Sequence, residues 1–186
     1  MILALDQEKA WLCHVRHCPS PHWDERPLGV TPNLIVIHGI SLPPREFGGN
    51  YIDKLFQGHL NPNEHPYFAG IVHLRVSAHV LINRRGEITQ YVSFLKRAWH
   101  AGQSCFEGRE QCNDFSIGIE LEGCDDLAYT SAQYSQLIPL IRLLQQHWPE
   151  ITPDRIVGHY HIAPGRKTDP GEAFDWVRVF QGISKI

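Results

Sequence analysis

The chain has 186 residues, of which 42% are hydrophobic and 20% are charged, so it fits one compact domain and cannot be wholly disordered. Seventeen lysines and arginines against twenty acidic residues leave a formal net charge of −3. No strong basic field therefore exists to favour binding to nucleic acid. We expect a single domain that spans residues 1–186.

The first 32 residues predict a segment that wraps over the surface of this domain. Its opening run, MILALDQEKAWL, meets Asp6 after five apolar positions, which is too short for a signal peptide or a membrane span. Residues 19–32 are rich in proline and cannot form a regular helix. The five cysteines form no C-x-x-C motif and cannot all pair within one chain, so we expect a cytoplasmic, reducing environment.

The next part of the chain predicts a buried strand, a short helix and a hairpin. Residues 34–37 (LIVI) are a continuous β-favouring run, as in a strand that is covered on both faces. His38 stands at the carboxyl end of this run. A helix is expected over 51–56, and the runs 76–82 and 87–94 flank a turn, which predicts a β-hairpin.

The second half predicts two further strands and two helices. Residues 116–122 alternate polar and apolar side chains, which predicts a half-buried strand with a polar face. A helix opens with a capping box at Thr130 and runs to Pro149. A short strand over 155–157 and a last helix over 172–181 follow. This mixed order predicts an α/β fold with a mixed central β-sheet flanked by helices.

Two histidines occupy similar positions at the ends of apolar strands. His38 ends the first such run, and His159 follows another at Gly158. Asp169 lies ten positions after His159, and two imidazoles with one carboxylate form a ligand set of catalytic zinc. On spacing alone, a histidine at a strand end is more often a hydrogen-bonded structural residue than a metal ligand. In an extended chain His161 would face the same side as His159 and is its rival, but the neighbouring glycine favours His159.

Two acidic residues and one lysine are candidates for the chemistry itself. Glu120 lies on the polar face of its strand, where burial among apolar neighbours would raise its pKa, as a general base requires. Its ordinary alternative is a solvent-facing strand residue, and Glu122 on the same face is the rival base. Lys167 precedes Asp169 by two residues. It would stabilise an oxyanion at the metal's edge, or it is an ordinary solvated lysine.

Five blocks of the sequence carry a resemblance to a known family, and they cover residues 36–49, 65–82, 97–102, 112–123 and 158–171. These blocks resemble the AmpD family of zinc amidases. This family acts on anhydromuramoyl peptides in the recycling of the bacterial cell wall. The resemblance implies the fold that these amidases share with peptidoglycan recognition proteins. It also implies a cytoplasmic, monomeric enzyme with a small-molecule substrate and no nucleic-acid or membrane partner.

The same resemblance assigns roles to the candidate residues. It implies one Zn²⁺ per chain, held by His38, His159 and Asp169. Glu120 would then take a proton from the attacking water, and Lys167 would stabilise the transition state. The predicted reaction is hydrolysis of the amide between the lactyl group of 1,6-anhydro-N-acetylmuramic acid and the L-alanine of the stem peptide.

Substrate contacts follow from the resemblance as well. Trp99 would line the sugar pocket and Tyr67 its rim, while Arg75 would lie near acidic groups of the peptide; an aromatic wall and a forked cation suit these partners. Trp99 would otherwise only pack in the core, and Arg75 would pair with a surface acid. Two positions depart from the family pattern, because Gly39 and Gln111 stand where the family has Asn and Arg.

Three other functions compete with this one. A recognition module would bind muropeptides without cutting them. Such a module needs no complete set of metal ligands, so the presence of a complete set in this chain speaks against it. An amidase of the periplasmic or phage type would act on intact murein. A metal-storage or sensing protein would use the twelve histidines to hold several weakly bound ions.

Overall fold

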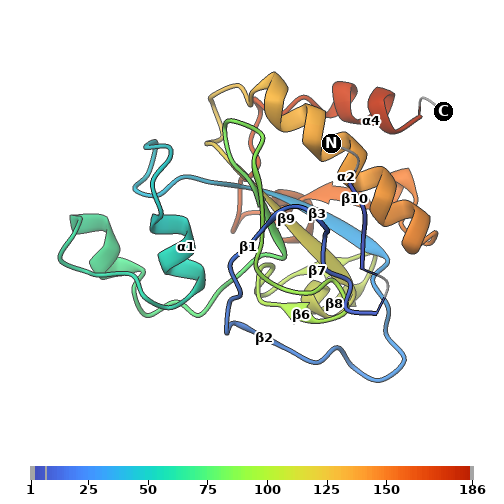
Figure 1. The fold of residues 1–186 in the computed structure, drawn as a ribbon, viewed down its shortest axis with the longest axis horizontal. Coiled ribbons are helices and arrows are strands. Elements are labelled where there is room, and N and C mark those ends of the chain that lie inside the picture. The colour runs from blue at the N-terminus through green and yellow to red at the C-terminus, as the bar shows by residue number, and fades with distance from the viewer. Residues whose placement is uncertain (1–2, 7, 185–186) are drawn as a thin grey trace.

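The computed structural model describes residues 3–6 and 8–184 and contains a six-stranded mixed sheet with the order β1-β5-β4-β9-β3-β10 (Figure 1). Pairing is parallel except between β4 and β5. Helices flank the sheet, so the predicted fold class is confirmed. The strands of the sheet are β1 (Arg16–His17), β3 (Leu34–Ile40), β4 (Val80–Ile82), β5 (Ile88–Gln90), β9 (Ser116–Glu122) and β10 (Ile156–Gly158).

Short strands and helices complete the fold. Two antiparallel pairs join β2 (Trp23–Asp24) to β6 (Arg97–Ala98) and β7 (Cys105–Phe106) to β8 (Arg109–Glu110). The α-helices are α1 (Tyr51–Phe56), α2 (Ser131–His147), α3 (His159–Ile162) and α4 (Trp176–Ser184). The 3₁₀ turns are η1 (Pro66–Gly70), η2 (Cys112–Asp114) and η3 (Pro153–Arg155). No helix in the described part of the chain is long and apolar enough to cross a membrane.

Helix α2 begins at the predicted capping box and covers one face of the sheet. The Thr130 hydroxyl accepts a hydrogen bond from the Gln133 backbone N–H at 3.2 Å, and the Gln133 side chain accepts one from the Thr130 N–H at 2.9 Å. Gln133 also donates to the carbonyls of Ile82 and Glu122, which ties the helix to β4 and β9. Its apolar side, together with α4, packs on the isoleucines of β3 and β9.

Strand β9 differs from its prediction, because both of its faces are buried. Ile117, Ile119 and Leu121 face α2 in the main core. On the other face His100 lies so close to Gly118 that a Cβ added there would be 2.4 Å from the imidazole Cγ. The loops that follow β6 therefore cover the polar face, which residue alternation alone does not reveal.

Several strands and helices begin or end at residues other than those predicted. Strand β3 continues to Ile40, so His38 lies inside the strand rather than at its end. The two strands of the predicted hairpin are only three residues each. The last helix starts at Trp176 instead of residue 172, because the Ala173 N–H donates to the Asp125 carbonyl at 2.9 Å and holds that stretch as a loop.

The amino-terminal segment lies along the β5 edge of the sheet. Leu12 is fully buried in the main core, and its N–H donates to the Gln90 side-chain oxygen at 2.6 Å. Further along, Cys18 and Ser20 donate to the backbone carbonyls of Gln90 and Tyr91 at 2.9 and 3.0 Å. The segment thus pairs with the edge of the sheet and adds Leu12 to the core.

Candidate active site

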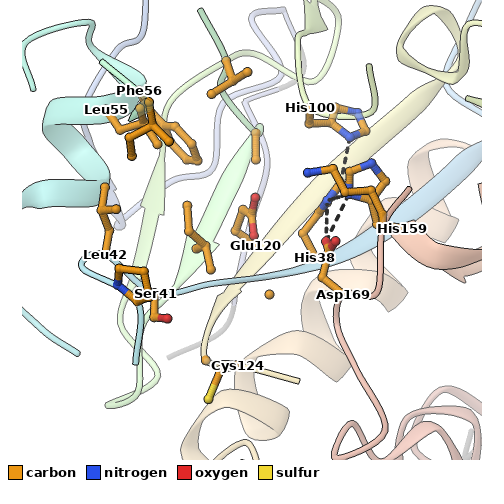
Figure 2. Close-up of a pocket in the computed structure, with 18 of the residues that line it drawn as sticks. His38, Ser41, Leu42, Leu55, Phe56, His100, Glu120, Cys124, His159 and Asp169 are labelled. Atoms are coloured by element: carbon orange, nitrogen blue, oxygen red, sulfur yellow. Dashed lines mark hydrogen bonds and ion pairs between the residues drawn. The ribbon is translucent and has the colours of Figure 1, made fainter. Parts of the chain in front are cut away.

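Three side chains from distant parts of the chain converge beside the sheet. His38 comes from β3, His159 is the first residue of α3, directly after β10, and Asp169 lies in the following loop. The two Nδ1 atoms are 3.0 Å apart, and each lies 3.1 Å from Asp169 Oδ2. Figure 2 shows all three pointing toward one another. The fold brings these residues together because β3 and β10 are adjacent and parallel.

The three donor atoms suit a metal ion. Zinc bonds of about 2.0–2.1 Å at tetrahedral angles place neighbouring ligand atoms about 3.3 Å apart, close to the 3.0–3.1 Å separations of His38, His159 and Asp169. The two histidines are 2% and 3% exposed, so solvent competes little for them. Two imidazoles and one carboxylate leave the fourth tetrahedral position for water or substrate.

Protonation also suits metal binding. Burial lowers the pKa of His38 to about 4, and the contact with the Asp169 carboxylate opposes this shift only in part. Burial alone would raise the pKa of Asp169, but its contacts with the imidazoles of His159 and His38 outweigh it and bring the pKa below its usual range. A neutral imidazole and an ionised carboxylate, the forms that bind metals, are thus favoured at neutral pH.

Glu120 lies directly beside this cluster, paired with His38 across the parallel strands β3 and β9. It is 9% exposed, and its Oε2 atom has no hydrogen-bond partner among the described residues. Burial, with the nearby charge of Asp169, raises its pKa well above the usual value, although Lys167 opposes the shift. An unsatisfied buried carboxyl beside a metal site is suited to proton transfer.

The rival carboxylate, Glu122, has a different environment. It is 4% exposed, but both of its oxygens accept hydrogen bonds, one from the Gly48 N–H and one from the Arg84 N–H. Both of its oxygens are therefore used to hold two loops at the end of β9.

The rival histidine, His161, also points elsewhere. Its Nδ1 accepts a hydrogen bond from the Gly158 N–H at 3.0 Å. The expectation that His159 and His161 share a side assumed an extended chain, whereas both lie in the helical turn α3. Residues two apart in a helix do not face the same way.

The cluster lines a cavity of about 580 Å³. Glu120, Lys167, Trp99 and Tyr67 also line it, and Figure 2 shows Glu120 in its wall. Arg75 is exposed and is not among the residues that line this cavity. The cavity is of the size and polarity expected for a small-molecule site.

Of the two departures from the family pattern, Gly39 lines the cavity and Gln111 is exposed outside it. A Cβ at Gly39 would lie 2.3 Å from the Tyr129 hydroxyl oxygen. That hydroxyl donates to the carbonyl of Pro170 at 2.9 Å. Gly39 therefore admits a tyrosine that ties down the loop carrying Asp169.

Comparison with known proteins shows the family to which this chain belongs. Residues 28–172 match the family model of N-acetylmuramoyl-L-alanine amidases. The 1,6-anhydro-N-acetylmuramyl-L-alanine amidase AmpD of Citrobacter freundii is 61% identical over 171 residues, covering 92% of this chain and 91% of that protein. This chain belongs to the AmpD family of amidases. It is thus a hydrolase that cleaves an amide bond.

Two solved structures of amidases resemble this chain to different degrees. A crystal structure of a selenomethionine AmpD derivative superposes with a TM-score of 0.94 at 59% identity, covering 97% of this chain and 99% of the other. The Escherichia coli amidase AmiD, solved with the substrate anhydro-N-acetylmuramic acid-L-Ala-D-γ-Glu-L-Lys, has a TM-score of 0.59 at 26% identity. That match covers 97% of this chain and 65% of AmiD.

Sequence reasoning missed the residues behind the histidine pair of this amidase. His100 Nδ1 lies 2.9 Å from His38 Nε2, and Figure 2 draws this contact. His79 accepts from the Gly118 N–H at 3.0 Å and contacts the Lys96 carbonyl, also at 3.0 Å. Both histidines were visible in the sequence, but nothing in their spacing indicates which buried groups they contact.

Proposed function

We propose that this amidase hydrolyses the bond between the lactyl group of 1,6-anhydro-N-acetylmuramic acid and L-alanine during murein recycling. The name of the Citrobacter relative and the substrate bound to AmiD support this substrate class. The observation that carries the proposal is the meeting of His38, His159 and Asp169 within 3.1 Å of one another, beside the unpartnered Glu120.

The metal in this proposal is one zinc ion per chain, with His38 Nδ1, His159 Nδ1 and Asp169 Oδ2 as ligands. The separations of these three atoms support it, as do the lowered pKa values of His38 and Asp169. A bound zinc ion supplies a Lewis acid for the scissile carbonyl and lowers the pKa of a water molecule to about 7.

Glu120 would act as the general base and then as the general acid. Its free oxygen would take a proton from the attacking water and later give it to the leaving amine of L-alanine. The raised pKa of Glu120 supports the second step, because the carboxyl holds the proton until the amine leaves. Lys167, at the cavity wall, would stabilise the negative charge on the carbonyl oxygen.

Trp99 and Tyr67 would contact the sugar end of the substrate. Trp99 stacks on His22, with ring centroids 6.0 Å apart and planes at 22°, so its ring is held in place in the cavity wall. Tyr67, in η1, is 47% exposed, as a residue at the rim would be. Arg75 remains a predicted contact for acidic groups of the stem peptide, reaching them from outside the cavity.

We also propose that residues 1–186 form a single monomeric domain in the cytoplasm. The burial of Leu12 in the main core supports including the amino-terminal segment. All five cysteines are unpaired, which suits a reducing compartment.

Cleavage of a synthetic anhydromuramoyl peptide tests this function. The protein loaded with one zinc per chain should release the free peptide, and a chelator should abolish release until zinc is restored. Binding without cleavage would favour a recognition module, and faster cleavage of intact murein than of anhydro fragments would favour the other amidase type. Several weakly held zinc ions per chain would favour storage. Each of these results contradicts the proposal.

A further inference from the structure

One two-residue segment contacts the outer nitrogens of both candidate histidine ligands. His38 Nε2 lies 2.9 Å from His100 Nδ1, and His159 Nε2 lies 3.1 Å from the Ala101 carbonyl oxygen. A carbonyl only accepts, so His159 must donate from Nε2, which leaves its Nδ1 lone pair facing His38 and Asp169. The segment 100–101 thus faces the outer side of the entire histidine pair.

His100 is arranged to accept from His38 in the same way. Its Nε2 lies 3.1 Å from the Ser116 hydroxyl, which can accept a hydrogen bond from it. With the ring proton on Nε2, the Nδ1 atom of His100 has a lone pair for a proton-bearing nitrogen. Gly118 makes room for the ring, so the imidazole lies between His38 and strand β9. The outer nitrogen of His38 is then the donor, and its Nδ1 also keeps a free lone pair.

The Asn113 side chain holds both backbone N–H groups of this segment, and the Ala101 carbonyl also accepts from Arg166 at 2.7 Å. Asn113 Oδ1 accepts hydrogen bonds from the backbone N–H groups of His100 and Ala101, at 3.1 and 2.8 Å. Asn113 lies in η2, whose carbonyls at Asn113 and Asp114 accept from the Arg26 guanidinium at 3.1 and 2.8 Å. The backbone that carries the Asn113 side chain is therefore itself held by a partly buried cation.

We propose that Asn113 is a positioning residue for the metal centre, acting on both histidine ligands through the segment His100–Ala101. By fixing this backbone it keeps one acceptor behind each imidazole and so selects the tautomer with a free Nδ1. This inference rests on the proposed role of His38 and His159 as zinc ligands. Partners of this kind commonly change metal affinity about 10–100-fold when removed.

The first test is zinc affinity, measured by competition with a chromophoric chelator. Asn113→Ala should weaken zinc binding about 10–100-fold, whereas Asn113→Asp, which keeps an oxygen acceptor, should bind nearly as well as wild type. Asn83 offers a matched control, because its Oδ1 also accepts from two backbone N–H groups, those of Arg85 and Glu87, at 3.0 and 2.9 Å. Asn83 lies in the hairpin turn, so Asn83→Ala should leave zinc affinity unchanged.

The second test is the ¹⁵N NMR signature of the imidazoles in the metal-free protein. Wild type should show His38 and His159 with protonated Nε2, and Asn113→Ala should shift both toward a mixture of tautomers. His100→Phe keeps a ring but removes the acceptor, so it should alter the tautomer of His38 and leave that of His159 alone. This variant also tests the inference if Asn113→Ala fails to fold.

Two results would overturn the inference. One is wild-type zinc affinity with unchanged tautomers in Asn113→Ala; the other is an equal loss of affinity in Asn113→Ala and Asn83→Ala. Failure of the proposed function gives a different result, in which His38→Ala binds zinc as well as wild type. The tautomer measurement needs no metal and decides the positioning role in that case too.

Discussion

Glu120 and Glu122 lie two residues apart on the same strand, yet their surroundings differ. Both are almost fully buried, at 9% and 4% exposure. The oxygens of Glu122 accept from the backbones of Gly48 and Arg84, whereas Oε2 of Glu120 has no partner in the described part of the chain. Burial alone therefore does not identify the catalytic acid; an unused hydrogen-bonding capacity beside a cavity does.

The register of β9 against β3 explains this difference. Glu120 pairs with His38 and faces the cavity, while Glu122 pairs with Ile40, where the chain leaves the sheet. Loops after β3 and β4 then supply the backbone donors that Glu122 needs. One carboxylate is placed for chemistry and the other for stability, and substitutions can separate the two roles.

The largest effect is expected for Glu120→Gln. The amide cannot take a proton from water, so kcat should fall by about 10²–10⁴-fold. Zinc content should stay at one per chain and the unfolding temperature should not fall, because no hydrogen bond to Oε2 is lost. Cleavage assays, metal analysis and calorimetry on the same preparation check this, and near-normal kcat would remove Glu120 from the mechanism.

Lys167→Ala should have the next largest effect. Loss of one group that stabilises an oxyanion costs about 2.7–4 kcal/mol of transition-state stabilisation, or about 10²–10³ in kcat. Lys167 is exposed at the cavity wall, so the fold and the zinc content should be unaffected. Unchanged turnover on the anhydromuramoyl peptide would show that this lysine is only a solvated surface residue.

Glu122→Gln should lower stability and leave kcat nearly unchanged, which is the opposite of the result expected for Glu120→Gln. The new amide can accept from only one of the Gly48 and Arg84 N–H groups and sets an NH₂ group against the other. The free energy of unfolding should fall by about 1–3 kcal/mol, while kcat stays near the wild-type value. Urea unfolding and steady-state kinetics measure the two quantities. A large loss of kcat in a stable Glu122→Gln protein would contradict the division of roles.

The smallest effect at neutral pH is expected at His79, which contacts the same strand through Gly118. Burial lowers the pKa of His79 to about 3 from an ordinary value of 6.5. The unfolded chain therefore binds a proton that the folded protein does not. The contribution of neutral His79 to the free energy of unfolding is therefore complete above pH 6.5 and is lost as the pH falls toward 3.

The variant that tests this pH dependence is His79→Gln, because a glutamine side chain also has one group that accepts and one that donates hydrogen bonds. It should flatten the decline in unfolding free energy between pH 6.5 and pH 4 by up to about 1.4 kcal/mol per pH unit. Urea titrations of the metal-free protein at several pH values provide the slopes. Identical slopes in wild type and variant would mean that His79 is already protonated in the folded state.

Much of the fold could be predicted because its elements are encoded locally. The β-favouring run before His38 and the capping box at Thr130 both lead to the observed strand and helix. The covered polar face of β9 could not be predicted, since alternation reports polarity and not what packs against it. The extent of β3 and the late start of α4 depend on hydrogen bonds to other segments.

The candidate site also contains residues that the sequence indicated and residues that it did not. Strand positions and the resemblance to a family indicated His38, His159, Asp169 and Glu120, which the fold brings together. Asn113 carried no such signal, because its role depends on a side-chain oxygen reaching the backbone 12 residues earlier in the chain. Contacts of this kind arise only from the folded path of the loop between β6 and β9.

The most direct test of the metal site is a crystal structure of the zinc-loaded protein, with diffraction data collected on both sides of the zinc absorption edge. One anomalous peak should lie about 2.0–2.2 Å from His38 Nδ1, His159 Nδ1 and Asp169 Oδ2. The free oxygen of Glu120 should face the fourth position. A peak at other side chains, or one bound through the Nε2 atoms, would contradict the account.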